Sequence, residues 1–295
     1  MKRHLKIGTR ESELAVWQAS HVQKLLKEIG VDSELIFIKS EGDIDTKTPL
    51  YELGVQGIFT KTLDAALLNN RVDVAVHSMK DVPTQPAAGI RLAAVLKRAS
   101  YKDILVYKGD RKVIEDKMND NQHSTFIIAT SSVRRKAQWL NRYSNDTIEN
   151  LRGNVNTRLR KLEENNWNGA IFAAAGLERI NLRPENSIDL DWMLPAPAQG
   201  AIAISCREED KDTFEVVHLL NDEETQICTK IERNFLRTLL GGCSTPISAL
   251  AVFENNKIIF RGNVCSVNGK EKFDVKKEVS MENKNDLGVN AANEI

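Results

Sequence analysis

Short apolar runs and helical patterns alternate over the first hundred residues. Between Ser12 and Ile29 apolar side chains recur every three or four positions, which predicts a helix ended by Gly30. A second helix is predicted over Phe59–Leu68. The strand-like runs are Leu5–Gly8, Leu35–Ile38, Val72–Val76 and Leu92–Leu96. This alternation predicts a parallel or mixed sheet with helices on its faces.

The same alternation starts again after residue 100. Helices are predicted over Ser132–Arg142 and Val155–Leu162, and Lys108–Ser124 is predicted to be a polar, charged connection. The strand-like runs of this second unit are Ile104–Tyr107, Thr125–Ala129 and Gly169–Ala173. A second α/β unit is therefore expected.

The last third of the chain has a different pattern. The turn-rich segment Leu194–Gly200 precedes a strand at Ala201–Ser205 and an acidic helical segment, and a helix from about Thr225 reaches Gly241–Gly242. Three β-rich segments follow near Ile247–Phe253, Lys257–Val264 and Phe273–Val279. This tail is typical of a small α+β domain.

The two α/β units share a local feature. Ile7–Arg10 and Ile128–Ser131 each leave a predicted strand through a small residue and a threonine, and each then opens a helix. The N-terminus of such a helix has unpaired N–H groups that suit carboxylates or phosphates. For one copy alone, simple capping of the helix is the better interpretation. Two copies in successive units favour a ligand cleft between the units.

Composition narrows the class of protein. The chain has 295 residues, with 41 basic and 41 acidic side chains, 41% hydrophobic residues and 28% charged residues. These values exclude a polybasic protein and favour a soluble globular one of two or three compact units. The N-terminus lacks the apolar core of a signal peptide, and no run is long enough to span a membrane, so we expect a cytoplasmic protein. The four cysteines lack the spacing of a zinc site, and no metal is expected.

The neutral total conceals two charged segments. Thr130–Lys161 holds eight basic and two acidic residues, a net charge of +6, whereas Arg207–Glu224 has a net charge of −6. Arginine binds carboxylates and phosphates through two parallel hydrogen bonds, so the basic segment is a candidate anion site. A solvated surface and a nucleic-acid interface are the alternatives, although the segment has few aromatic residues and no zinc-finger or basic-zipper pattern.

Helical spacing predicts where the arginines of this segment point. In the first helix Val133, Ala137 and Leu140 are expected to form the buried stripe, with Arg134 and Arg135 in the first turn beside the N-terminal amides. In the second helix the expected stripe is Val155, Leu159 and Leu162, with Arg158 off it. Both helices are therefore able to direct arginines into one cleft.

Two further positions are candidates for chemistry. Asp81 follows a strand and stands next to Lys80, where it is either an acid–base group or a turn residue before Val82–Pro83. Cys243 lies in the glycine-rich segment Gly241–Pro246, where a thiol is accessible to chemistry. The other cysteines lie in apolar or amphipathic runs and are expected to pack in cores.

Six motifs together resemble the porphobilinogen deaminase family, also called the hydroxymethylbilane synthase family. They are IGTRESELAVWQ (7–18), VDVAVHSMKDVPT (72–84), IATSSVRRKAQ (128–138), LRGNVNTRLRKL (151–162), AAAGLERI (173–180) and LGGCSTPI (240–247). They occur in the order of the family and span most of the chain.

The resemblance implies an α/β fold of two periplasmic-binding-protein-like domains that flank a cleft, plus a small C-terminal α+β domain. The expected limits are 1–101 with 199–217 for the first domain, 102–198 for the arginine-rich second domain, and 218–295 for the third. It implies a transferase that condenses four porphobilinogen molecules head to tail, with release of ammonia, on a covalent dipyrromethane primer. Hydrolysis then releases hydroxymethylbilane. A monomer without nucleic-acid or membrane partners is expected.

The resemblance also assigns roles to residues. Asp81 matches the aspartate that donates a proton during deamination and stabilises the positive charge on the pyrrole, and Cys243 matches the cysteine that carries the dipyrromethane through a thioether. Further cofactor-binding residues are Ser12, Lys80, Thr130, Ser132, Arg134, Arg135 and Arg158. Substrate-binding residues are Arg10, Gln18, Arg152 and Gln199.

Some positions depart from the pattern of the family. Gly54-Val55-Gln56-Gly57 stands where Gly-Gly-Lys-Gly is usual, and Thr62, Ala198 and Leu240 replace common Glu, Gly and Glu residues. These changes bear on rate and domain motion more than on the type of reaction. Two other classes of function stay open: a non-catalytic two-lobed binding protein, which gives Cys243 no task, and a basic-patch nucleic-acid binder, whose binding falls steeply with salt.

Overall fold

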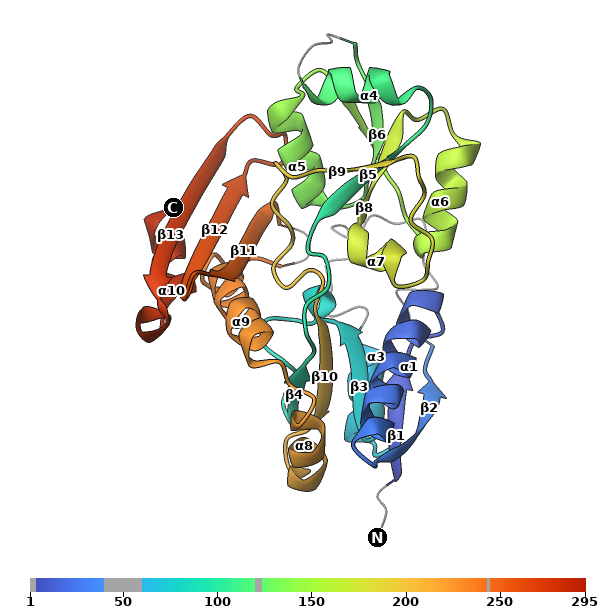
Figure 1. Cartoon of the computed structure of the whole chain (residues 1–295), viewed down its shortest axis with the longest axis vertical. Coiled ribbons are helices and arrows are strands. Elements are labelled where there is room, and N and C mark those ends of the chain that lie inside the picture. Colours follow the sequence, from blue (N-terminus) through green and yellow to red (C-terminus); the bar gives the residue numbers. More distant parts are fainter. Residues whose placement is uncertain (1–3, 40–59, 120–123, 243–244) are drawn as a thin grey trace.

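The computed structural model describes residues 4–39, 60–119, 124–242 and 245–295. Within them lie two five-stranded sheets and one three-stranded sheet. The five-stranded sheets form a lower and an upper α/β lobe, and the third sheet lies beside them with its helices (Figure 1). Among the described residues, no helix combines the length and apolar character needed to cross a bilayer.

The sheet of the lower lobe has the order β2-β1-β3-β10-β4. Its strands are β1 (His4–Thr9), β2 (Asp32–Phe37), β3 (Val74–Ser78), β4 (Ile90–Val95) and β10 (Ile202–Arg207), and its helices are α1 (Glu13–Glu28), α3 (Lys61–Leu68) and α8 (Lys211–His218). β1 pairs in parallel with β2 and β3, whereas β10 is antiparallel to both β3 and β4. A strand from the last third of the chain therefore completes the first sheet.

The sheet of the upper lobe repeats this arrangement in the order β7-β6-β8-β5-β9. Its strands are β5 (Asp103–Tyr107), β6 (Ile127–Ala129), β7 (Thr147–Glu149), β8 (Gly169–Ala173) and β9 (Ser187–Asp189), and its helices are α4 (Arg111–Met118), α5 (Val133–Arg142), α6 (Val155–Glu164) and α7 (Ala174–Glu178). β6 is parallel to β7 and β8, and β5 is antiparallel to β8 and β9. The predicted second α/β unit is confirmed.

The third sheet is an antiparallel meander. It consists of β11 (Ile247–Glu254), β12 (Lys257–Cys265) and β13 (Lys272–Ser280), with α9 (Glu223–Thr238) and α10 (Leu287–Glu294) packed against it. Its core includes Phe235 of α9, whose ring centroid lies 5.2 Å from that of Phe260. The predicted α+β tail, and with it the predicted fold class, is confirmed.

Several elements were not predicted. Helix α4 lies inside the segment expected to be a connection, because its charged composition conceals one buried face formed by Ile114 and Lys117. The Asp110 side chain caps this helix by accepting a hydrogen bond from Lys112 N. Strands β7 and β9 are three residues long, too short for an alternating pattern to be recognised.

The expected buried stripe of α5 is confirmed for Ala137 but wrong for Val133 and Leu140. Arg134, Arg135 and Trp139 are buried, whereas Val133 and Leu140 are only partly buried. The arginines face inward because a buried carboxylate, described below, receives their guanidinium groups. For α6 the expectation is confirmed, since Leu162 is buried and Val155 and Leu159 pack against the same core.

Two extended segments run side by side between the lobes. Ala99 N donates to Gly200 O, and Arg98 Nε donates to Gln199 O. Gly200 has a φ of 90°, and a β-carbon there would lie 2.7 Å from Ser100 O, so only glycine fits this crossing. The proposed domain limits at 101/102 and 198/199 fall in these connections and stay a prediction.

Candidate active site

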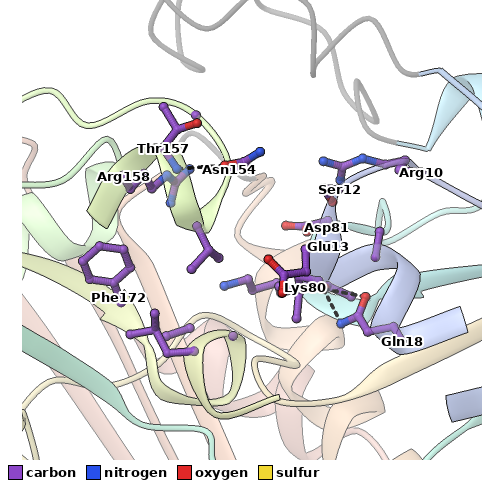
Figure 2. A pocket seen from close by; sticks show the side chains of 18 of the residues that line it. Arg10, Ser12, Glu13, Gln18, Lys80, Asp81, Asn154, Thr157, Arg158 and Phe172 are labelled. Carbon is purple, nitrogen blue, oxygen red and sulfur yellow. Dashed lines mark hydrogen bonds between the residues drawn. The ribbon is translucent and has the colours of Figure 1, made fainter. Parts of the chain in front are cut away.

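A cleft of about 690 Å³ opens between the two five-stranded sheets. Side chains from both lobes line it and point toward one another (Figure 2). The predicted site residues that line it are Arg10, Ser12, Gln18, Lys80, Asp81, Ser132, Arg134, Arg135, Arg152, Arg158 and Gln199. The fold thus brings together residues that are up to 189 positions apart in the sequence.

The turn that carries Lys80 and Asp81 lies at the end of β3. Residues Met79–Asp81 form a single 3-10 turn, and both side chains face the cleft (Figure 2). Lys80 Nζ lies 3.4 Å from Gln199 Oε1, to which it donates a hydrogen bond. Burial, helped by the nearby charge of Arg135, lowers the pKa of Lys80 to about 8. The turn thus places a buried amine and a carboxylate next to one another on the wall of the cleft.

The first turn of α1 forms the lower wall of the cleft. Ser12 occupies the N-cap position, but its side chain makes no capping hydrogen bond. Gln18 is buried one turn further on, where its Nε2 donates to Ser78 Oγ at 2.9 Å. Glu13 reaches across the cleft, and its Oε2 accepts a hydrogen bond from Asn156 Nδ2 at 2.8 Å. Ser12 thus has the backbone position of an N-cap, but its hydroxyl is not used to cap the helix.

Asp103, the first residue of β5, binds two of the arginines that line the cleft. Its side chain is fully buried, and its Oδ1 accepts hydrogen bonds from Arg135 Nη2 at 2.7 Å and Nε at 3.1 Å. Arg134 Nη2 lies 2.7 Å from Asp103 Oδ2, an ion pair that is not aligned as a hydrogen bond. Burial alone would raise the pKa of Asp103, but the two guanidinium groups lower it to about 2. The carboxylate is therefore ionised and holds both arginines in place.

Gln199 connects this carboxylate to the turn that carries Lys80 and Asp81. Its Nε2 donates to Asp103 Oδ1 at 2.9 Å and to Tyr101 O at 2.8 Å, while its Oε1 accepts from Lys80. One buried amide thus links the upper wall, the connection between the lobes and the Lys80–Asp81 turn. This chain of polar contacts fixes the relative positions of the side chains that line the cleft.

Arg152 and Arg158 complete the positive wall. Burial, together with the charges of Arg135 and Arg152, lowers the pKa of Arg158 to about 10. Within the described residues, Arg158 Nε is buried and has no hydrogen-bond partner. A buried donor without a partner is costly, so this group is suited to an anionic ligand that enters the cleft.

Among the predicted site residues that the structure describes, Thr130 does not line the cleft. Thr130 is buried, and its hydroxyl accepts a hydrogen bond from the backbone N–H of Ser132. Cys243 lies outside the described residues, as does the Gly54–Gly57 segment. Leu240, three positions before Cys243, is described: it is 92% exposed and has a φ of 51°, in the left-handed region.

Two residues of the site, Asp103 and His77, are not indicated by periodicity or by the charge pattern. Asp103 is an acidic residue at the start of an otherwise apolar, buried strand, a position that indicates a buried partner of opposite charge. His77 also lines the cleft, and burial together with Arg10 lowers its pKa to about 4, so the imidazole is neutral at pH 7. No group of three His, Cys, Asp or Glu side chains in the described part of the chain is arranged to hold a metal ion.

Comparison with known proteins settles the family. Residues 5–215 match the model "Porphobilinogen deaminase, dipyromethane cofactor binding domain", and residues 226–295 match "Porphobilinogen deaminase, C-terminal domain". The chain belongs to the porphobilinogen deaminase family. Family membership places it among the enzymes of tetrapyrrole synthesis and makes dipyrromethane its cofactor.

Individual relatives agree with the family models. A porphobilinogen deaminase of Acidithiobacillus ferrooxidans is 40% identical over 274 residues, which cover 92% of this chain and 88% of the relative. A probable porphobilinogen deaminase of Methanocaldococcus jannaschii is 42% identical over 258 residues, covering 86% and 85%.

Similar solved structures include two binding proteins. The methionine-binding protein MetQ has a TM-score of 0.46 at 14% identity, covering 76% of this chain and 92% of that one. An ancestral cationic amino acid solute-binding protein has a TM-score of 0.46 at 13% identity, covering 74% and 87%.

The cleft fits the cofactor of this family. Each pyrrole ring of a dipyrromethane carries an acetate and a propionate group, so the bound group brings several carboxylates. Arg134, Arg135, Arg152 and Arg158 all line the cleft, and the Nε of Arg158 lacks a partner within the described residues. Asp103 compensates part of this positive charge and leaves the remainder for a ligand.

The first prediction concerns Asp103. In Asp103→Asn two buried guanidinium groups lose their counter-charge, so we expect the free energy of unfolding to fall by about 3 kcal/mol or more. Chemical denaturation of the purified variant measures this change.

Asp189→Asn is the matched control. Asp189 also pairs with two cations, Lys102 and Arg183, but is 29% exposed, so its loss should cost about 1 kcal/mol or less. Equal stability changes for the two variants would contradict the role given to Asp103.

Proposed function

We propose that this chain condenses four porphobilinogen molecules head to tail on a dipyrromethane attached to Cys243 and then releases hydroxymethylbilane by hydrolysis, as a transferase. One observation carries the proposal beyond family membership. The cleft joins a carboxylate, Asp81, on one lobe to a cluster of buried arginines on the other. A reaction that releases ammonia from a carboxylate-rich substrate needs a proton donor and cations that bind the carboxylates. Asp81 and the buried arginines provide these two groups.

The arginines hold the carboxylates of the growing chain. Arg134, Arg135 and Arg158, with Ser12, Lys80, Thr130 and Ser132, are proposed to bind the cofactor. Arg10, Gln18, Arg152 and Gln199 are proposed to orient the incoming substrate. The positions of Arg134 and Arg135 are set before any ligand arrives, because Asp103 already holds them. Such preorganisation reduces the cost of ordering the site when a ligand binds.

Asp81 is proposed to act on the aminomethyl group of porphobilinogen. The bond that breaks joins the methylene carbon to nitrogen, and its electron pair leaves with the nitrogen as ammonia. Asp81 donates a proton to the amine as it leaves, and its carboxylate then stabilises the positive charge that develops on the pyrrole ring. The charges of Lys80 and Arg158 interact with that of Asp81 in the free cleft.

Cys243 is proposed to hold the cofactor through a thioether bond. When bound, the dipyrromethane supplies the nucleophilic pyrrole carbon to which the first substrate unit is joined. The remaining cysteines have no such task, because Cys206, Cys228 and Cys265 are buried. Burial raises the pKa of Cys228 to about 12 and that of Cys265 to about 11, which keeps both thiols protonated and unreactive.

The proposal extends to the working form of the protein. We infer a cytoplasmic monomer whose partner is its small-molecule substrate, with no nucleic acid and no membrane. The basic residues from Thr130 to Lys161 support this view, because four of their arginines face the cleft between the lobes.

The second prediction concerns Cys243. Intact mass spectrometry of the purified protein should reveal an added mass equal to two linked pyrrole units, and Cys243→Ser should lack it because the thioether cannot form. Cys228→Ser is the control and should keep the addition. An active protein of unmodified mass would contradict the proposal.

The third prediction concerns Asp81. Asp81→Asn keeps the shape of the side chain but removes the proton donor and the charge, so we expect kcat to fall by about 100-fold or more with substrate still bound. Stopped assays for hydroxymethylbilane measure turnover on protein whose cofactor content is known from its mass.

Asp73→Asn is the control, because Asp73 immediately precedes β3, at the end opposite the turn, and pairs with Arg207. Its turnover should stay close to that of the wild type. Near-normal turnover of Asp81→Asn would remove Asp81 from the reaction.

A further inference from the structure

Arg233 of α9 contacts the turn that carries Lys80 and Asp81. Its side chain is 8% exposed, its Nη1 donates to Val82 O at 2.7 Å and to Met79 O at 3.4 Å, and its Nη2 donates to Pro83 O at 2.5 Å. These carbonyls lie on both sides of the Lys80–Asp81 pair. One guanidinium group therefore holds the backbone before and after the proposed catalytic carboxylate.

The turn has little regular structure of its own. Met79–Asp81 is a single 3-10 turn closed by a hydrogen bond from Val82 N to Met79 O. Met79 N donates to Ala201 O, which lies just before β10. A turn of this size is not stabilised by a ladder of backbone hydrogen bonds. Its position thus depends on contacts from outside, and Arg233 supplies three of them.

Helix α9 is itself fixed at the same place. Glu232, the neighbour of Arg233, is fully buried, and its carboxylate accepts hydrogen bonds from Arg98, Ala198 N and Ala251 N. Its partners come from both connections between the lobes and from β11. The helix therefore cannot slide or rotate at this turn without breaking charge-assisted hydrogen bonds.

The same helix leads to the proposed cofactor cysteine. α9 ends at Thr238, where Gly241 N donates to Leu236 O in the turn that follows, and Cys243 comes ten positions after Arg233 in the sequence. The contacts of Arg233 with residues 79–83 therefore join α9, the helix that precedes Cys243 in the sequence, to the segment that bears Asp81.

We propose that Arg233 is a positioning residue that holds the backbone on both sides of Asp81 and so sets the position of its carboxylate in the cleft. This inference rests on the function proposed above for Asp81 and Cys243. Arginine suits the task better than lysine because its planar fork donates to several carbonyls at once. Loss of the fork lets the turn shift, and a shift of about 1 Å in a reacting group costs about 100-fold in rate.

The test compares Arg233→Met and Arg233→Lys with the control Arg237→Met. Arg237 lies one turn further along α9 and is exposed. Each variant is purified as holoenzyme, its cofactor content is measured by intact mass, and kcat and KM for porphobilinogen are determined per loaded molecule. We expect Arg233→Met to lose about 100-fold in kcat with little change in KM. Arg233→Lys should regain part of kcat, and Arg237→Met should match the wild type.

A double mutant separates positioning from a general loss of stability. If Arg233 acts through Asp81, adding Arg233→Met to Asp81→Asn should lower kcat little further, because the carboxylate is already gone. A full multiplicative loss in the double mutant would overturn the inference, as would unchanged kcat in the loaded Arg233→Met enzyme. Where Arg233→Met does not fold, Arg233→Lys in the same cycle decides the question by the same criteria.

Failure of the proposed function is recognised separately. A wild-type protein that neither carries the pyrrole addition nor turns over porphobilinogen would overturn both proposals. A wild-type enzyme that does both, with Arg233 variants that behave like Arg237→Met, would overturn this inference alone.

Discussion

The ion pairs of Asp103 with Arg134 and Arg135 are the interaction on which the cleft depends. Several guanidinium groups buried close together repel one another, and the lowered pKa of Arg158 reflects that repulsion together with burial. One fully buried carboxylate compensates part of this charge and holds two arginines in place. The cleft is thus stable enough to form and still positive enough to attract a ligand with many carboxylates.

The same contacts connect the lobes to one another. Gln199 bonds to Asp103 and Lys80, and it stands in a connection between the sheets whose other strand contains Arg98. Glu232 joins both connections to the third sheet. Residues that line the cleft are therefore bonded directly to the two segments that connect the lobes.

Much of this architecture could be predicted from periodicity and motifs. The repeated strand and helix patterns indicated two α/β units and an α+β tail. The resemblance to the family indicated eleven residues that line one cleft, ten of them within the six motifs. Periodicity failed where polar side chains are buried. It directed Val133 and Leu140 inward, because no local rule shows that Asp103, some thirty positions earlier, makes a buried site for Arg134 and Arg135.

Contacts between distant segments were likewise beyond local patterns. Glu232 contacts a connection between the lobes, and Arg233 contacts the turn after β3. The spacing of residues in their helix gives no sign of either contact. Weak periodic signals also come from α4 and from the three-residue strands β7 and β9. Neighbours far away in the sequence decide which of their side chains are buried.

The central claim is that the buried arginines receive the carboxylates of a pyrrole chain inside the cleft. A crystal structure of the cofactor-loaded protein tests it most directly. We expect pyrrole rings between the lobes, with a carboxylate within hydrogen-bond distance of the Nε of Arg158. Pyrrole rings lying outside the cleft, with Arg158 still lacking an anionic partner, would contradict it.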